Sequence, residues 1–439
     1  MADQANTAEH GYELARRLFE LRGDDLCVGG LPVRSIVSQT GSPVFIYDGS
    51  VMRTAYRRLS KVLEGFASIY YSAKANPAQA VIRLFLQEGA GIEIASLGEY
   101  RTAIAAGASP KQIIFAGPGK RRQELETVVP DGIDEIHVEG LDEIERLRSI
   151  GLPVRVSIRV NPVPTVQAGA MRMGGKPTAF GFDEEDLEAA IAAITAVPNI
   201  ELVGIHVYGG TQILDASALL AQWRHSIDLA GRVARMIGRP LETIDLGGGL
   251  GIPYYSIDKP LDLDAVAAAV PELTGMLKAD ALLADTRVIV EPGRYLAGEA
   301  GLYVSEINAV KQSRGTRFVV MEGGMNHHLA ASGNLGQVIK RNYPVVAPAR
   351  MTATASGPVT LVGPLCTPLD TLARDALMPD LGVGDLVAVL QSGAYGATAS
   401  PLNFLSHPHP AEVLVEDGQI KTISCDRAGK PAPTGEGMP

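Results

Sequence analysis

Apolar residues between positions 68 and 290 recur with two alternating spacings, which predict alternating strands and helices. Short runs rich in β-branched and other apolar residues have the length and composition of buried strands: Ser68–Ser72, Ile92–Ala95, Gln112–Ala116, Glu135–Val138, Val154–Val160, Leu202–Val207, Thr243–Leu246 and Arg287–Val290. The segments between them have the apolar spacing of amphipathic helices: Gln79–Gln87, Leu97–Ala106, Gln123–Val129, Leu141–Ile150, Glu184–Ala193, Ala218–Met236 and Asp264–Ala279. Eight strands alternating with seven helices predict an α/β fold with a parallel (β/α)8 TIM barrel rather than an open sheet.

The sequence changes character after Arg294, where helical spacing becomes scarce. Strand-like runs separated by turns follow: Leu302–Val310, Arg317–Met321, Val359–Val362, Leu386–Leu390, Ala411–Glu416 and Gln419–Ile423. This pattern predicts a second, mostly β domain.

The two patterns also predict the domain boundaries. We expect the barrel domain to cover residues 43–300 and to begin with a strand at Pro43–Tyr47. Residues 1–42 are expected to join residues 301–425 in the β domain. Residues 426–439, with their glycine, proline and small polar side chains, are typical of a flexible tail.

Composition narrows the class of protein. A net charge of −10 argues against a nucleic-acid-binding surface. Three widely spaced cysteines suggest a reducing compartment without a disulfide framework. The sequence contains neither an apolar signal segment at its start nor an apolar run long enough to span a membrane. These features predict a cytoplasmic enzyme with no membrane association.

Chemically useful residues follow most of the predicted barrel strands. They are Lys74, Glu93, Arg159 with Asn161, His206, Gly247, Gly248 and Gly249, and finally Glu291 with Gly293 and Arg294. Active sites of such barrels are built from the loops at the carboxyl ends of the strands. The sequence therefore predicts one active site at this end of the barrel.

A lysine and a glycine run in these places suggest the cofactor pyridoxal phosphate (PLP). The amine of Lys74 can form a Schiff base with its aldehyde, although a surface lysine just past a strand would explain that stretch alone equally well. Residues 247–249 free the backbone to approach a phosphate, although a tight turn would also explain them. Glu291 could keep the pyridine nitrogen protonated, and His206 could stack on the ring unless it is only a core histidine. Glu93 could lie near the imine, or it could form a structural ion pair.

A series of ordered motifs resembles the fold-type III PLP-dependent decarboxylases, which include the diaminopimelate, ornithine and arginine decarboxylases. The motifs span roughly residues 40–410 and are Tyr71–Asn76, Glu93–Ser96 with Gly98 and Glu99, His206, Gly247–Gly251, Glu291–Arg294, Gly363–Cys366 and Ser392–Gly396. The resemblance implies an alanine-racemase-like barrel with a β domain, and a homodimer whose subunits share active sites.

The resemblance also implies a role for each matching residue. Lys74 would be the Schiff-base lysine, His206 would stack on the ring, and Glu291 would pair with the pyridinium nitrogen. Gly247, Gly248 and Gly249, with Arg294, would hold the phosphate, and Gly293 would also belong to the cofactor site. Tyr395 would reach the phosphate or the ring from the second domain. Cys366 would come from the other subunit and return a proton after CO2 leaves.

Two other classes share this barrel. Alanine racemases are known for an arginine at the ring nitrogen, so Glu291 favours a decarboxylase. Non-catalytic PLP-binding proteins of the same barrel lack the β domain, whose Cys366 and Tyr395 motifs are present in this chain.

The substrate is less clear because Thr367 follows Cys366. Diaminopimelate and ornithine decarboxylases carry a glutamate or an aspartate there, so a neutral residue removes the charge that holds a distal cation. Asp370 could supply that charge instead, which keeps a free diamino acid substrate as an alternative. Arg159 is a further candidate for substrate binding.

Several stretches resemble a narrower group, the decarboxylases associated with exosortase A systems and the butirosin-pathway decarboxylase. They include Met171–Gly181, His206–Gln212, Gly323–His328, Arg341–Pro344 and Ser406–Pro408. The butirosin enzyme acts on glutamate carried by an acyl carrier protein, whose neutral thioester suits Thr367. An acidic carrier could dock on Gly119–Arg122 or on Arg172 and Lys176, although short basic runs are common on surfaces.

His327 and His328 invite a metal interpretation. Adjacent residues of a strand point to opposite faces, so they cannot easily share one ion. We predict no metal.

Overall fold

The computed structural model describes residues 2–163, 171–172, 177–337 and 340–422. The chain forms two compact units. The barrel unit contains residues 55–252 and 259–295, and the β unit contains residues 1–54, 253–258 and those from 296 onward. The predicted tail at 426–439 and part of the Met171–Gly181 motif lie outside the described residues.

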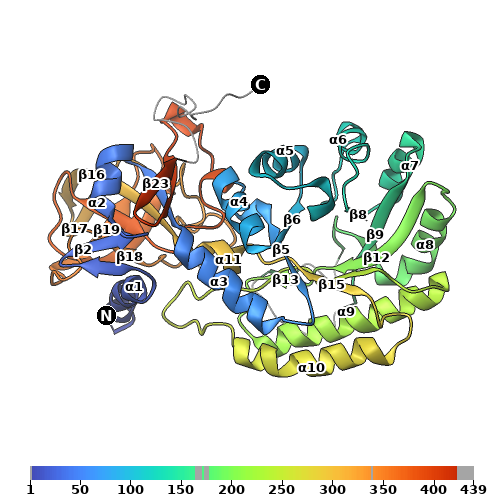
Figure 1. Ribbon diagram of the computed structural model, residues 1–439. Helices are drawn as coiled ribbons and strands as arrows, with labels where there is room; N and C mark the ends of the chain where they lie inside the picture. Colours follow the sequence, from blue (N-terminus) through green and yellow to red (C-terminus); the bar gives the residue numbers. More distant parts are fainter. Residues whose placement is uncertain (1, 164–170, 173–176, 338–339, 423–439) are drawn as a thin grey trace. The chain divides into compact units, whose positions relative to one another are not determined.

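The barrel unit confirms the predicted fold class (Figure 1). Its parallel strands are β5 (Ser68–Ser72), β6 (Gly91–Ile94), β7 (Ile113–Phe115), β8 (Glu135–Val138), β9 (Val154–Asn161), β12 (Ile200–Val207), β14 (Thr243–Asp245) and β15 (Arg287–Val290). They pair in the order β9-β12-β14-β15-β5-β6-β7-β8, and a pairing of β8 with β9 closes the ring. β5, β8 and β15 have the predicted bounds, and the other strands differ from the prediction by one or two residues at an end.

Helices cover the outside of this ring. They are α4 (Gln79–Glu88), α5 (Leu97–Ala106), α6 (Arg122–Val128), α7 (Leu141–Ile150), α8 (Leu187–Thr195), α9 (Ala216–Ile237) and α10 (Leu263–Ala279). Four of them end on a glycine in the left-handed region, where a residue without a side chain is unstrained: Gly89, Gly107, Gly151 and Gly238. α9 and α10 pack side by side.

The β unit is built around one long strand, β16 (Gly301–Ser313). Its first half is buried between β4 (Val44–Asp48) and β21 (Leu386–Val389), and its second half pairs with β17 (Thr316–Met321). The bulge at Ile307 lies between these halves, as bulges do where a strand bends. The predicted strand at Pro43–Tyr47 therefore exists, but β4 belongs to the β unit although the barrel domain was expected to begin at residue 43.

The remaining strands of the β unit extend this arrangement. They are β18 (Val345–Val346), β19 (Gly357–Val362), β20 (Thr371–Met378), β22 (Ala411–Glu416) and β23 (Gln419–Thr422), and a small separate sheet of β1 (Glu20–Arg22), β2 (Asp25–Val28) and β3 (Leu31–Pro32). Helices α1 (Ala2–Leu18) and α2 (Val33–Thr40) belong to the same unit, and buried residues of both helices join its core. β20 was not predicted, because its alanines, leucines and methionine favour helices and only pairing with β19 makes it a strand.

None of the described helices combines the length and the apolar character that a membrane crossing needs.

Close backbone packing inside the barrel gives a test of the fold. A Cβ atom at Gly204 of β12 would lie 2.3 Å from the carbonyl oxygen of Thr243 and 2.4 Å from the hydroxyl of Ser157. We expect Gly204→Ala to lower the free energy of unfolding by about 1–3 kcal/mol, since overpacked interiors strain their neighbours. Denaturant unfolding followed by circular dichroism would measure it.

Gly275 provides the matched control, because it lies inside α10 with no heavy atom within 4 Å of a built Cβ. Gly275→Ala should raise stability by up to about 1 kcal/mol through helix propensity. Equal effects of the two substitutions would contradict the close packing at Gly204.

Candidate active site

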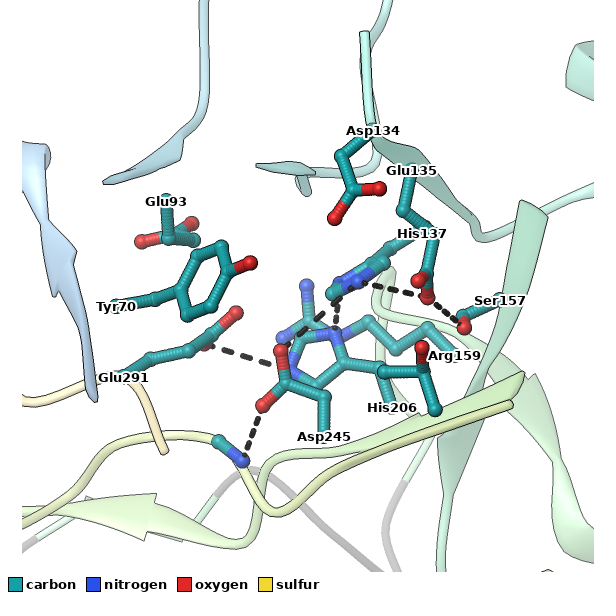
Figure 2. Close-up of polar contacts among 12 residues, drawn as sticks. Tyr70, Glu93, Asp134, Glu135, His137, Ser157, Arg159, His206, Asp245 and Glu291 are labelled. Carbon is teal, nitrogen blue, oxygen red and sulfur yellow. Dashed lines mark hydrogen bonds and ion pairs between the residues drawn. The ribbon is translucent and has the colours of Figure 1, made fainter. Parts of the chain in front are cut away.

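The barrel strands bring several of the residues predicted from the sequence together, and Figure 2 shows Glu93, Arg159, His206 and Glu291 among them. Lys74 lies in the short helical turn Ala73–Ala75, directly after β5, and its Nζ lies 2.6 Å from Oε2 of Glu93 on β6. The Ser72 hydroxyl donates to the same oxygen at 2.5 Å. The Glu93 side chain is 1% exposed and that of Lys74 is 41% exposed, so a buried carboxylate holds an accessible amine.

Close backbone contact fixes the turn that carries Lys74. A Cβ atom at Gly293, after β15, would lie 2.8 Å from the Cβ of Ala75 and 3.2 Å from that of Ser72. Only glycine fits at this distance, and the Ser72 amide also donates to the carbonyl of Pro292. Gly293 therefore packs against the lysine turn, and its predicted cofactor contact stays a prediction.

The glycine run after β14 forms a compact backbone loop. Gly247 and Gly249 have φ values of 69° and 96°, in the left-handed region. A Cβ atom at Gly247, Gly248 or Gly249 would lie 2.4–2.6 Å from a neighbouring carbonyl oxygen, so side chains are excluded from the loop. The Gly247 amide donates to Oδ1 of Asp245 at 2.8 Å.

Four buried side chains form a polar cluster within the barrel. Nε2 of His206 lies 3.5 Å from Oε2 of Glu291, and Nδ1 of His206 lies 2.9 Å from Nδ1 of His137. Nε2 of His137 lies 3.9 Å from Oδ2 of Asp245. All four residues are at most 4% exposed.

Burial determines the protonation of this cluster. It lowers the pKa of both His137 and His206 well below the usual value, so both rings are neutral near pH 7. Burial and the charge of neighbouring Glu291 raise the pKa of Asp245 well above its usual value, which favours a protonated Asp245. Burial also raises the pKa of Glu99, at the start of α5, to about 7.

The same four residues offer donor atoms within 4.8 Å of one another, a spacing that could hold a metal ion. The sequence analysis predicted no metal, and this stays a prediction. His327 and His328 lie in the β unit, where Tyr303 and Pro408 contact the first ring and Ser392 contacts the second.

Arg159 is held by neighbours within the barrel unit. Its Nη1 donates to Oε1 of Glu139 at 2.8 Å, and its guanidinium lies over the rings of Phe180 and Tyr208. Glu139 also accepts from the amides of Gly117 and Gly181, so one carboxylate connects three loops. The predicted contact of Arg159 with substrate stays a prediction.

The β unit carries the Cys366 motif in the loop between β19 and β20. Cys366 is exposed and Thr367 is half-buried. Asp370 is 2% exposed, and its two carboxylate oxygens accept from the amides of Met325, at 2.6 Å, and Leu365, at 2.9 Å. The geometry favours a structural role for Asp370 over the predicted contact with a distal amine.

Tyr395 follows a tightly packed turn of the β unit. A Cβ atom at Gly393 would lie 1.8 Å from the carbonyl oxygen of Ala297, which explains the glycine. Tyr395 has φ of 54°, a strained conformation for a residue of its size, and residues held this way often serve function. Its predicted contact with the cofactor stays a prediction.

The sequence analysis did not select His137, Glu139 or Asp245. The sequence feature that could have identified them is a polar residue within or just after a short apolar strand, on the same alternating face as the predicted active-site residues. Glu135 and His137 of β8 show this period of two, and both are fully buried.

The predicted carrier-docking run at Gly119–Arg122 loses most of its support. Lys120 is 2% exposed, and its Nζ lies 2.8 Å from Oε1 of Glu143 and donates to the carbonyl of His137. Arg121 and Arg122 pair with glutamates of α6. Because Lys120 is buried, its ammonium group cannot contact a carrier protein. The side chains of Arg172 and Lys176, the other predicted docking residues, lie outside the described residues.

Comparison with known proteins gives consistent relationships. Residues 50–298 match the family described as "Pyridoxal-dependent decarboxylase, pyridoxal binding domain". The chain is 38% identical to the L-glutamyl-[BtrI acyl-carrier protein] decarboxylase of Niallia circulans, over 89% of this chain and 92% of that protein. It is 33% identical to the diaminopimelate decarboxylase of Methanothermobacter thermautotrophicus, over 91% and 92% of the two chains. A solved structure from Aquifex aeolicus is similar with a TM-score of 0.82 at 28% identity, over 95% and 96% of the two chains.

The buried pair of Lys120 and Glu143 gives a test of this part of the site. We expect Lys120→Met to lower stability by about 3–5 kcal/mol, because it leaves the Glu143 carboxylate buried without its cation. Thermal unfolding would measure the loss. Lys111→Met, at an exposed lysine of the same unit, is the control and should change stability by less than about 0.5 kcal/mol. Unchanged stability of Lys120→Met would contradict a stabilising role for the buried pair.

Proposed function

Because this chain belongs to the pyridoxal-dependent decarboxylases, we propose that its substrate is glutamate held as a thioester on an acyl carrier protein. The chain is a PLP-dependent carboxy-lyase, so the bond broken is the one between the α-carbon and its carboxylate. The proposal concerns which amino acid is presented, and in what form.

The residues of the barrel unit suit this cofactor. Oε1 of Glu291 is buried and has no hydrogen-bond partner among the described residues, as expected for an atom that awaits a pyridinium N–H. The glycine loop after β14 lies at the customary phosphate position of such barrels. Lys74 would hold the aldehyde carbon covalently, and Glu93 would neutralise the amine when it is free.

Each protein group then has a defined task. The bound cofactor supplies an electron-withdrawing ring that accepts the electron pair left when CO2 departs. Glu291 would keep the ring nitrogen protonated, and His206 would cover one face of the ring. The thiol of Cys366 would return a proton to the α-carbon, which completes the exchange of a carboxylate for a hydrogen.

One observation carries the substrate proposal: the loop after Cys366 offers no exposed carboxylate. Thr367 is neutral, and both oxygens of Asp370 already accept backbone amides. Loss of an α-carboxylate requires that this group be free, so a thioester must join glutamate through its side-chain carboxyl. The distal end is then uncharged, and a neutral loop can accept it without leaving a charge unpaired.

The runner-up is a free diamino acid, since relatives at 33% identity are diaminopimelate decarboxylases. A distal ammonium group needs a carboxylate partner when it loses water. Asp370 is buried and already holds the amides of Met325 and Leu365, so it could serve only if the loop moved to expose it.

Measurement of CO2 release from matched substrates tests the proposal. We expect kcat/KM for the carrier-bound γ-glutamyl thioester to exceed that for free glutamate, ornithine or diaminopimelate by on the order of 100-fold or more. Thr367→Glu should reduce turnover of the thioester because it places an unpaired charge beside a neutral group. Thr367→Ser is the control and should retain activity. Efficient turnover of a free diamino acid by the unmodified enzyme would reject the carrier-bound substrate.

The proposed homodimer with shared sites has its own test. Lys74→Ala and Cys366→Ala should each be inactive alone as pure proteins, because each lacks one essential group of the proposed site. When the two are mixed and allowed to exchange subunits, half of the dimers are mixed and each regains one intact site, so activity should return to about a quarter of the unmodified level. A mixture that stays inactive although mixed dimers form would contradict sharing.

A further inference from the structure

The hydrogen bond between His137 and His206 has no role in the mechanism above. The two Nδ1 atoms lie 2.9 Å apart, the ring centroids lie 4.5 Å apart, and the ring planes are inclined at 48°. Both side chains are buried, and Figure 2 shows the rings facing each other from β8 and β12.

The register of the barrel explains how these rings meet. β9 lies between β8 and β12. His137 of β8 is level with Ser157 of β9, and Ser157 is level with Gly204 of β12. His206 lies two residues further along β12, level with Arg159 of β9. β12 therefore adds no side chain at the level of His137, and the imidazole of His137 can reach the underside of His206. The Lys120 ammonium, which donates to the carbonyl of His137 at 2.6 Å, fixes the end of β8.

The short distance between the two Nδ1 atoms limits how many protons can lie between them. Two bare nitrogens would repel at this distance, and two N–H groups would clash, so one proton lies between the two Nδ1 atoms. Both rings are neutral because burial keeps each pKa well below its usual value. The two histidines must therefore be opposite tautomers: the donor has a bare Nε2, and the acceptor has a protonated Nε2.

The neighbours of the two Nε2 atoms indicate which histidine donates the hydrogen bond and which accepts it. Nε2 of His137 lies 3.7 Å from Oε1 of Glu135, which already accepts from the Ser157 hydroxyl, and 3.9 Å from Oδ2 of Asp245. Burial raises the pKa of both carboxyl groups, which weakens their demand for an N–H donor from His137. Nε2 of His206 lies 3.5 Å from Glu291, which as a carboxylate needs a donor. A bare Nε2 on His137 and a protonated Nε2 on His206 therefore suit the carboxyl groups that lie nearest to each atom.

We propose that His137 is a positioning residue that donates its Nδ1–H to Nδ1 of His206 and so holds His206 in the Nε2–H tautomer. The imidazole of His206 then directs its Nε2–H toward Glu291. Glu291 remains an acceptor, and its Oε1 would be available to the pyridine nitrogen of the cofactor. The catalytic consequence rests on the proposed roles of Glu291 and His206, whereas the hydrogen bond and the tautomers do not.

Nitrogen NMR of the histidine rings tests the proposal without turnover. The full chain, labelled with 15N-histidine, prepared without cofactor and treated with a chelator, would give long-range 1H–15N spectra of its 8 histidines. His206→Asn and His137→Asn would assign the two sets of signals. We expect His206 as the Nε2–H tautomer and His137 as the Nδ1–H tautomer. An Nδ1–H tautomer of His206, or Nε2–H tautomers of both rings, would overturn the proposal.

Variants of His137 provide the second readout. His137→Asn keeps a side-chain donor near the place of Nδ1, so the His206 signals should stay in the Nε2–H pattern. His137→Leu removes the donor, and the His206 signals should move away from that pattern. Pyridoxal phosphate, titrated by its absorbance, should bind about tenfold more weakly to the leucine variant and nearly normally to the asparagine variant.

His225→Asn is the matched control, because His225 is a half-buried histidine of α9 that pairs with Glu184. It should change neither the His206 signals nor cofactor binding. If the leucine variant does not fold, the tautomers of the unmodified chain and the asparagine variant still decide the outcome. If the chain shows the expected tautomers but does not decarboxylate the proposed substrate, the proposed function would be refuted and the tautomer proposal would stand.

Discussion

The barrel interior depends on burying carboxyl groups and imidazoles side by side without unpaired charge. Asp245 ends β14 and Glu291 directly follows the neighbouring strand β15, and two adjacent buried carboxyl groups cannot both ionise at low cost. Because Asp245 favours its protonated form, Glu291 can keep the negative charge that a pyridinium partner requires. The neutral His137 and His206 lie between these carboxyl groups and share one hydrogen bond, so the position of its proton depends on the neighbours of both rings.

Backbone packing keeps this cluster in place. Gly293 lets the loop after β15 lie against the lysine turn, and Gly204 leaves space beside β9 and β14. Lys120, which looks like a surface residue in the sequence, instead connects the end of β8 to Glu143 of α7. Reactive side chains held by strands and close backbone contacts are positioned more accurately than those on free loops. The barrel therefore fixes the positions on which the proposed tautomers depend.

Sequence analysis predicted the barrel well because its strands are short apolar runs with clear turn signals between them. It selected Lys74, His206 and Glu291 because barrel chemistry gathers at strand ends, and their roles stay predictions. It could not find His137, since a polar residue within a strand does not reveal what lies opposite, and that depends on register across β9. Lys120 was misinterpreted because its burial depends on Glu143, which is distant in the sequence. β20 was missed because pairing overrides the helical preference of its residues.

The loop around Thr367 can select among substrates because it offers no available negative charge. Free glutamate ends in a carboxylate and a diamino acid in an ammonium group, and each must find an opposite charge when it leaves water. Asp370 is occupied by two backbone amides, so this loop provides no negative partner, whereas a thioester needs none. Affinity must then come from contacts remote from the reacting carbon, which a long carrier arm and its protein can supply. A charged residue at position 367 would reverse this preference, so that single side chain is the simplest point at which the family could change substrate.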